Sequence, residues 1–151
     1  MDDFTSQPGI PNQFGLIQGA SNAIAPGKRM LSAMAPTIVL DPAGRTFLLI
    51  GGRGGPRIIT SVAQVILNVI DHRMTLADAM SAPRIHHQAL PDTIRYEAGG
   101  IEPTELAKLR AMGYALGSQE KIGAQVAAIR RVRAGYEGMT DPRGDGKAAG
   151  Y

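Results

Sequence analysis

The first regular pattern along the chain is a pair of short apolar runs. Apolar and β-branched residues fill positions 37–40, a turn sequence Asp-Pro-Ala-Gly follows at 41–44, and a second apolar run occupies 45–50. Two such runs on either side of a short turn predict a β-hairpin. Leucine and isoleucine fill 48–50 without an alternating polar residue. We therefore expect the second strand to be covered on both faces.

A helical pattern begins just after a run of five residues rich in glycine. Ile59, Val62 and Ile66 recur at intervals of three and four residues, which places them on one face of a helix over 56–71. Pro56 suits the first turn of that helix, because its missing N–H group would have no intrahelical partner there. Similar signals farther along the chain predict a short helix over 75–80, two short strands within 84–97, a helix over 102–112 and a strand over 124–132.

Both ends of the chain lack periodicity. Residues 1–35 contain Pro-Gly and Pro-Asn dipeptides, and residues 135–151 are again rich in turn residues. An irregular stretch as long as the first is unusual at the start of a compact domain. We expect either a functional loop there or pairing elements that lie outside the chain. No internal repeat and no domain boundary is visible, so we treat residues 1–151 as part of one domain.

The composition is that of a folded and slightly basic chain. Of 151 residues, 44% are hydrophobic and 19% are charged, and the formal net charge is +3. Aromatic residues make up 5% and tryptophan is absent, which leaves little material for stacking on bases. We interpret the cluster of Arg130, Arg131 and Arg133 as a solvated face and expect no nucleic-acid partner. No apolar run is long enough for a membrane span, and the acidic start is unlike a signal peptide.

Metal and thiol chemistry find little support in the sequence. The absence of cysteine excludes disulfides, thiolate metal sites and a cysteine nucleophile from this chain. His86 and His87 are adjacent, so on a strand their side chains would point to opposite faces and could not easily share one ion. We therefore interpret both as packing histidines and expect no metal.

The glycine-rich segment between the predicted strand and helix is the most informative local feature. Glycines let the backbone turn sharply and leave peptide N–H groups free to point at an anion, and the helix N-terminus adds partial positive charge. Two chemistries fit, namely phosphate binding and an oxyanion hole for acyl transfer. The Walker word Gly-Lys-Ser/Thr and the dinucleotide pattern Gly-x-Gly-x-x-Gly are absent from this segment. A turn without any ligand is the third alternative.

Taken together, these segments resemble γ-glutamyltransferase (γ-glutamyltranspeptidase, glutathione hydrolase), specifically the C-terminal part of its small subunit. The similarity covers nearly the whole chain, in the same order. The matching words include Met-Asp-Asp-Phe at 1–4, Pro-Gly-Ile-Pro-Asn at 8–12, Pro-Gly-Lys-Arg at 26–29, Pro-Thr-Ile-Val at 36–39, Ala-Pro-Arg at 82–84, His-His-Gln at 86–88, Asp-Pro-Arg at 141–143 and Ala-Gly-Tyr at 149–151. So many words in one order make the resemblance specific.

The resemblance implies a fold and a reaction. The fold is α+β, the four-layer αββα sandwich of N-terminal-nucleophile hydrolases, of which this chain would be an incomplete part. Such a precursor cleaves itself, and its new N-terminal threonine attacks a γ-glutamyl amide such as glutathione to form an acyl-enzyme. Water, an amino acid or a peptide then accepts the γ-glutamyl group. The implied partners are this donor and acceptor, the large subunit and the rest of the small subunit, without an organic cofactor. Complete enzymes of the family tend to be periplasmic or extracellular.

The resemblance also assigns roles to four residues of this chain. Asp3 matches the carboxylate that holds the α-ammonium group of the donor. Ser32 matches the first residue of a Ser-Ser pair that binds the α-carboxylate. Gly54 and Gly55 match the pair whose backbone N–H groups form the oxyanion hole, which is one of the two chemistries left open above.

The chain also departs from the family pattern. Ala33 replaces the second serine of the pair, Arg53 and Pro56 alter the glycine-rich loop, and the nucleophile word Thr-Thr-His does not occur. We therefore expect the chain to begin partway through a longer reading frame and to be inactive alone. Two alternatives stay open: a related amide acylase of the cephalosporin or glutaryl acylase kind, and an inactive truncated product with at most a binding role. Unpaired sheet edges should favour association.

Overall fold

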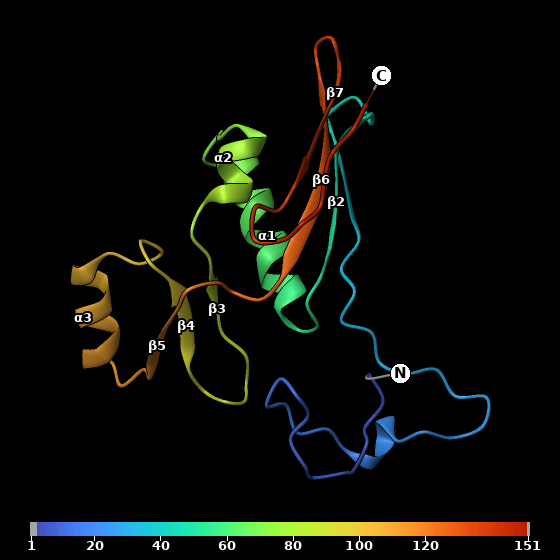
Figure 1. The fold of residues 1–151 in the computed structure, drawn as a ribbon, viewed down its shortest axis with the longest axis vertical. Helices are drawn as coiled ribbons and strands as arrows, with labels where there is room; N and C mark the ends of the chain where they lie inside the picture. The colour runs from blue at the N-terminus through green and yellow to red at the C-terminus, as the bar shows by residue number, and fades with distance from the viewer. Residues whose placement is uncertain (1–2, 151) are drawn as a thin grey trace.

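The computed structural model describes residues 3–150, and its largest element is a four-stranded antiparallel sheet (Figure 1). The strands follow the order β1 (Thr37–Leu40), β2 (Thr46–Arg53), β6 (Gln125–Val132) and β7 (Gly135–Thr140). The predicted hairpin is confirmed as β1 and β2, and the strand predicted over 124–132 as β6. The interpretation of 135–151 as irregular is wrong for β7. This strand pairs with β6 along its whole length, so long-range pairing rather than a local apolar pattern creates it.

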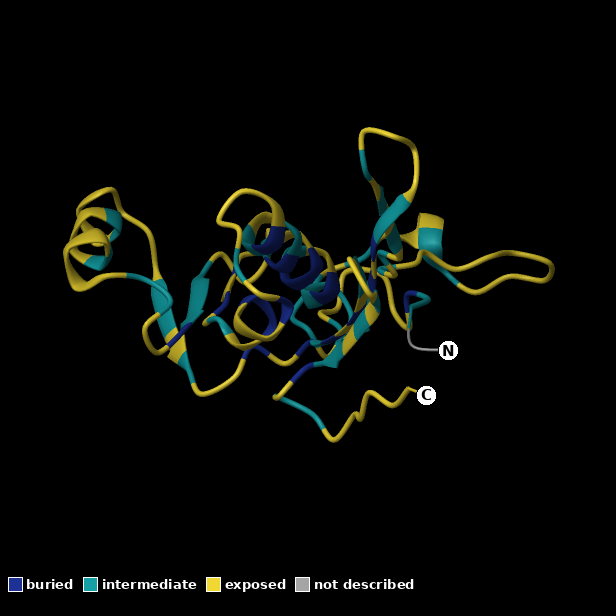
Figure 2. Cartoon of the chain, turned by 90° about the horizontal axis from the view of Figure 1, so that it is seen from above, coloured by how far each residue is buried: buried dark blue, intermediate teal, exposed yellow. Residues whose placement is uncertain are grey.

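Two helices cover one face of this sheet. The predicted helices are confirmed as α1 (Arg57–Ile70) and α2 (Leu76–Ser81), and their buried residues share one core with those of the sheet. Figure 2 colours the chain by burial and shows these buried parts at the centre of the molecule. The core combines apolar residues of both layers: Leu48, Ile50, Val126 and Ala128 from the sheet, and Ile58, Val62, Val65, Val69, Leu76, Ala79 and Met80 from the helices. Among residues 3–150, no helix is long and apolar enough to cross a membrane.

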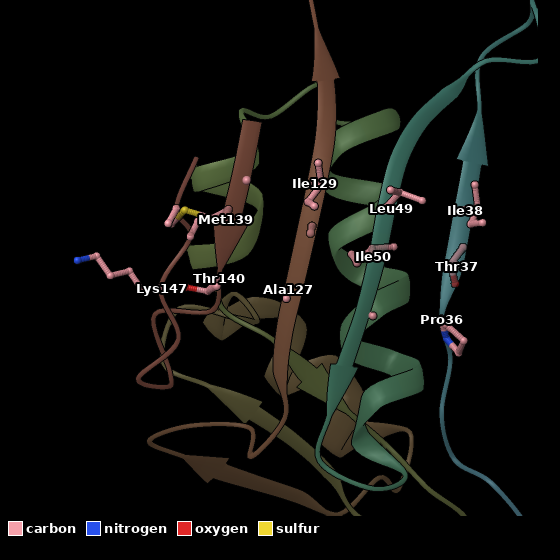
Figure 3. A pocket seen from close by; sticks show the side chains of 15 residues that line it. Pro36, Thr37, Ile38, Leu49, Ile50, Ala127, Ile129, Met139, Thr140 and Lys147 are labelled. Atoms are coloured by element: carbon pink, nitrogen blue, oxygen red, sulfur yellow. The ribbon is translucent and has the colours of Figure 1, made fainter. Parts of the chain in front are cut away.

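The opposite face of the four-stranded sheet is open. Leu48 and Ile50 are 0% and 5% exposed, whereas Leu49 between them is 37% exposed. The prediction that this strand is covered on both faces is therefore wrong within the described residues. Ile38 and Ile129 extend the same apolar surface, which forms a groove of about 730 Å³ (Figure 3). We call this surface the open face.

A smaller sheet lies on the other side of the helices. Its strands are β3 (Ile85–His86), β4 (Ile94–Glu97) and β5 (Leu116–Gln119), and α3 (Pro103–Ala111) connects β4 to its parallel neighbour β5. The two predicted strands within 84–97 and the predicted helix over 102–112 are confirmed. The sequence did not predict β5, because its segment Leu-Gly-Ser-Gln has a single apolar residue and becomes a strand only by pairing with β4.

Residues 3–35 form an irregular segment, which we call the N-terminal lobe. In Figure 1 it lies beneath the turn that joins β2 to α1. Its one helical element is the 3-10 turn η1 (Ala20–Asn22), and its pairing consists of two isolated bridges, Thr5 to Ala23 and Pro11 to Ile17. The prediction of an irregular, turn-rich start is confirmed for these residues; Met1 and Asp2 lie outside the described part of the chain.

The basic cluster on β6 takes part in ion pairs. Arg130 pairs with Glu137 of β7 at 2.7 Å, and Arg131 pairs with Asp41 in the β1–β2 turn. These contacts join neighbouring parts of the sheet, so two of the three cations already have carboxylate partners. The interpretation of the cluster as a solvated face fits the exposed Arg133, whereas Arg130 and Arg131 are half-buried and paired.

The two sides of β2 give a matched pair of stability mutants. Leu48→Ala removes a fully buried side chain and should lower the free energy of unfolding by about 2–5 kcal/mol. Leu49→Ala changes the next residue, which lies on the open face. In the same 151-residue chain, this substitution should lower the free energy of unfolding by less than half as much. Urea denaturation followed by circular dichroism measures both values. Equal losses would contradict the one-sided burial of the strand.

Candidate active site

The chain reverses between β2 and α1 through two glycines in backbone conformations that other residues rarely adopt. Gly54 and Gly55 have φ angles of +136° and +61°, where a side chain is unfavourable. A Cβ atom on Gly54 would lie 2.6 Å from the Cα of Ala124, and one on Gly55 would lie 2.6 Å from Cε2 of Phe14. Within the described part of the chain, neither glycine N–H donates a hydrogen bond. The turn thus has two uncommitted donors, which is what an oxyanion hole requires.

The ring of Phe14 covers this turn from the N-terminal lobe. Besides its contact with Gly55, the ring lies 5.9 Å from the guanidinium carbon of Arg57, within the range of a cation–π interaction. The side-chain amide of Gln88 donates to the carbonyl of Phe14 at 2.6 Å. Sequence reasoning missed Phe14, because its contacts join parts of the chain that are far apart in sequence. The local signal was only an aromatic residue inside a turn-rich segment.

The two residues expected to bind the amino-acid head group of a donor lie in the N-terminal lobe. Asp3 is half-buried and Ser32 is exposed. Asn22 links their segments: its side chain donates to the carbonyl of Asp3 at 2.6 Å and accepts from the N–H of Leu31 at 3.0 Å. The four predicted site residues therefore form two groups, one in the lobe and one in the glycine turn. The contact of Phe14 with Gly55 joins the lobe to that turn.

The positions that depart from the family pattern lie around these two groups. Ala33, next to Ser32, has no hydroxyl group, and the Ser32 hydroxyl accepts a hydrogen bond from the N–H of Met34 at 3.2 Å. Arg53 is exposed just before the glycine pair, and its Nε donates to Oε1 of Gln125 at 2.7 Å. The guanidinium group of Arg53 therefore lies beside the glycine turn, and its hydrogen-bond partner is a neutral amide rather than a carboxylate.

A group of four charged side chains lies behind the glycine turn. Arg84, Glu97 and Asp141 are 1%, 5% and 3% exposed, so they are withdrawn from water. Arg84 pairs with Asp141 at 2.6 Å, while Arg143 pairs with Glu97 and, at 3.2 Å, with Asp141. Arg84 also donates to the carbonyl of Ala124 at 3.2 Å. We call these four residues the buried ion cluster.

Both carboxylates and Arg143 of the buried ion cluster favour their charged forms, whereas burial lowers the pKa of Arg84. Burial opposes ionisation of Asp141, but hydrogen bonds from the N–H groups of Arg143 and Val126 and the charge of Arg84 hold its pKa below the ordinary value. The pKa of Glu97 is also lowered against the effect of burial, chiefly by its hydrogen bond from Arg143. That same bond raises the pKa of Arg143. Both carboxylates are therefore ionised at neutral pH.

The cluster also fixes the wall against which the glycine turn lies. Asp141 accepts from the N–H of Val126 at 3.0 Å, and Arg84 holds the carbonyl of Ala124 two residues earlier. The Cα of Ala124 is the atom that leaves no room for a side chain on Gly54. The backbone geometry of the turn thus depends on a charged group outside it.

The two adjacent histidines have different environments. His86 is buried, with Nδ1 2.8 Å from the hydroxyl of Thr60 and Nε2 2.8 Å from Oε1 of Gln88, and burial lowers its pKa. The packing interpretation is confirmed for His86. It is wrong for His87, which is exposed and lies 2.7 Å from Asp92, because the chain leaves β3 at this point. Among residues 3–150, no group of three or more histidine or acidic side chains could hold a metal ion.

Comparison with known proteins agrees with the fold. A model of the family described as Gamma-glutamyltranspeptidase matches residues 1–151. The glutathione hydrolase proenzyme of Escherichia coli is 44% identical over 152 residues, covering 100% of this chain and 26% of that protein. That of Pseudomonas aeruginosa is 45% identical over 148 residues, covering 97% and 26%. A mutant gamma-glutamyltranspeptidase of Helicobacter pylori matches with a TM-score of 0.85 at 46% identity, covering 95% of this chain and 78% of that one.

These likenesses first define a class: the fold is the α+β fold of the N-terminal-nucleophile hydrolases. The transpeptidase CapD of Bacillus anthracis, at 23% identity and a TM-score of 0.70, shares that fold. Within the class, the chain belongs to the gamma-glutamyltranspeptidase family. The resemblance and the fold predicted from the sequence are confirmed. The chain spans about a quarter of the length of the curated relatives named above.

The buried ion cluster gives a pH-dependent prediction. Asp141→Asn leaves Arg84 buried without its carboxylate, so at pH 7 the free energy of unfolding should fall by about 3–5 kcal/mol. The pKa of Asp141 is lowered by folding, so its carboxylate stabilises the fold above the ordinary Asp pKa of about 4, and that stabilisation is lost as the pH falls through the lowered value. The gap between wild type and D141N should therefore narrow in acid.

Denaturant titrations between pH 7 and pH 2.5 measure this gap. Asp145→Asn provides the control, because it makes the same change at an exposed position four residues away and should cost less than about 0.5 kcal/mol at every pH. A gap for D141N that stays constant down to pH 2.5 would show that the ion pair does not carry the effect.

Proposed function

We propose that this chain supplies the donor-binding and oxyanion-stabilising part of an enzyme that cleaves γ-glutamyl amides such as glutathione. The observation that carries the proposal is the pair of uncommitted N–H groups at Gly54 and Gly55, in a turn covered by Phe14. Membership of the gamma-glutamyltranspeptidase family favours acyl transfer over phosphate binding at this turn.

In this proposal each site residue acts on one part of the donor. The carboxylate of Asp3 binds the α-ammonium group and the hydroxyl of Ser32 binds the α-carboxylate. The N–H groups of Gly54 and Gly55 stabilise the oxygen that becomes negative when the γ-carbonyl is attacked. The nucleophile is a threonine that lies outside these 151 residues, because the sequence has no Thr-Thr-His word. The acyl-enzyme then passes its γ-glutamyl group to water or to the amine of an amino acid or peptide.

The open face supports the need for further polypeptide. Leu49, Ile38 and Ile129 form an apolar surface on one side of the sheet, and such a surface is normally covered in a folded protein. We propose that the second sheet of the αββα sandwich, from the rest of the small subunit and from the large subunit, lies there. By the same family likeness, we propose that the complete enzyme acts in the periplasm or outside the cell.

A second candidate keeps the mechanism and changes the donor. Ala33 removes one hydroxyl from the site expected to bind the α-carboxylate, a group that γ-glutamyl and glutaryl donors both carry, so the head-group site departs from the family pattern. A glutaryl amide lacks the α-ammonium group that Asp3 would bind. The alternative is therefore an amide acylase of the glutaryl or cephalosporin acylase kind.

The decisive assay compares two anilides that differ only at the α-carbon. The complete proenzyme, matured by self-cleavage, should hydrolyse γ-glutamyl-p-nitroanilide with a kcat/KM at least tenfold above that for glutaryl-p-nitroanilide, because only the first has an ammonium group for Asp3. The 151-residue chain alone should release no p-nitroaniline from either. Preference for the glutaryl anilide would favour the acylase, and no turnover of either donor by the matured enzyme would rule out both proposals.

The oxyanion role predicts a specific loss of turnover. Gly55→Ala places a methyl group against Phe14 and disturbs a position with φ of +61°, so kcat of the matured enzyme should fall by about 10²–10³-fold. Gly44→Ala is the matched control, because Gly44 has a φ of +77° in the β1–β2 turn with no atom within 4 Å of the added Cβ. The Gly44→Ala enzyme should lose some folding stability, but its kcat should fall less than twofold. Similar kcat values for the two variants would refute the role of the turn.

A further inference from the structure

We propose that Asn22 is a positioning residue that sets the spacing between Asp3 and Ser32, and with it the preference of the enzyme for an α-amino-acid head group. The inference rests on the proposed function, since it assumes that Asp3 and Ser32 bind the two charges of a γ-glutamyl donor. It concerns a side chain that would not itself touch the substrate.

The side chain of Asn22 uses both ends of its amide. Its Nδ2 donates to the carbonyl of Asp3 at 2.6 Å and to Oε1 of Gln18 at 3.0 Å. Its Oδ1 accepts from the N–H of Leu31 at 3.0 Å. The backbone carbonyl of the same residue accepts from the N–H of Thr5 at 3.0 Å. One residue therefore holds the Asp3 segment on one side and the segment that leads into Ser32 on the other.

Within the described residues, no helix or strand pairing joins the Asp3 segment to the Ser32 segment. The segments of Asp3 and Ser32 belong to no helix or strand, and their nearest ladder is the isolated bridge from Thr5 to Ala23. Residues 24–30, which lead from Asn22 towards Ser32, are all exposed. A segment without a strand partner and without a buried side chain takes its position from its few hydrogen bonds. For the Ser32 segment, the bond from Leu31 to Asn22 is such a bond.

The chemistry of the donor explains why this spacing matters. The ammonium and carboxylate groups of a γ-glutamyl donor are attached to the same carbon atom, so a carboxylate ligand and a hydroxyl ligand must sit at one fixed separation to bind both. A glutaryl donor has no α-ammonium group, so its binding does not depend on that separation. With Ala33 in place of a second hydroxyl, recognition rests more heavily on the placement of Ser32.

Asparagine is suited to this link and aspartate is not. Asn22→Asp keeps the size of the side chain and its acceptor for Leu31. It removes both N–H donors and turns a carboxylate oxygen towards the carbonyl of Asp3 and the Oε1 of Gln18. The carbonyl of Asp3 then loses its hydrogen bond, while the backbone bond from Thr5 to residue 22 is kept.

The test uses the matured complete enzyme and the same two anilides. For N22D, KM for γ-glutamyl-p-nitroanilide should rise about tenfold with kcat changed less than threefold, since the glycine turn is untouched. The kcat/KM for glutaryl-p-nitroanilide should change less than twofold, so the preference between the donors should shrink about tenfold. Gln7→Glu is the matched control: it makes the same amide-to-acid change at an exposed residue of the same lobe, and both constants should stay within twofold of wild type.

The outcomes separate the two proposals. Wild-type enzyme without γ-glutamyl turnover would remove the proposed function itself. Wild-type turnover together with an N22D enzyme that matches Q7E would overturn the role of Asn22 alone. An equal loss for both donors, or a fall in kcat with KM unchanged, would also overturn it, because either result indicates general damage. If N22D does not mature, Asn22→Ser, which keeps a shorter donor and acceptor, is measured in the same way and should show the same KM increase.

Discussion

The ion pair between Arg84 and Asp141 is the contact on which the remainder of the site depends. Two charges that are almost fully withdrawn from water cost several kcal/mol each unless their hydrogen bonds are satisfied. The carbonyls of Met80 and Ala124, the N–H of Val126 and the neighbouring Arg143 provide most of those bonds. Among the described residues, only Nε of Arg84 is left buried without a partner in this pair. The end of α2 and the start of β6 must therefore meet in one arrangement. Ala124 then shapes the glycine turn, so a charged cluster determines the geometry of a backbone site.

Local spacing explains which elements the sequence could predict. The apolar runs of β1 and β2 and the three- and four-residue intervals of α1 are visible within single segments, and these elements were predicted correctly. β5 and β7 contain few apolar residues and exist through their pairing with β4 and β6. The apolar run at 48–50 correctly indicated a strand, but the predicted cover on both faces was wrong within the described residues, because Leu49 is exposed. Strand pairing and the burial of a sheet face both depend on residues that are distant in the sequence. A local pattern therefore cannot predict them.

The same distinction holds in the candidate site. The glycine-rich segment at 51–55 could be singled out from the sequence, because glycines between a strand and a helix have a local chemical meaning, but the assignment of Gly54 and Gly55 within it came from the family resemblance. Asp3 and Ser32 came from the family resemblance alone, since a lone carboxylate or hydroxyl in an irregular segment has no distinctive spacing. Phe14 was missed, because its place above the turn follows from contacts between distant parts of the chain.

Different interactions hold the two groups of candidate site residues, the glycine turn and the Asp3–Ser32 group in the N-terminal lobe. This difference affects which residues can be substituted without changing the backbone. The glycine turn lies between a strand and a helix and is limited by backbone atoms, so a side chain at Gly54 has no room. The head-group half is held by hydrogen bonds in an irregular lobe, where a neighbouring residue can change without moving a strand. Ala33 lies in that half, and Arg53 stands at the rim of the turn rather than inside it. The chain thus departs from the family pattern at Ala33 in the lobe and at Arg53 and Pro56 beside the turn, and keeps the glycine pair itself, to which we assign the stabilisation of the developing charge.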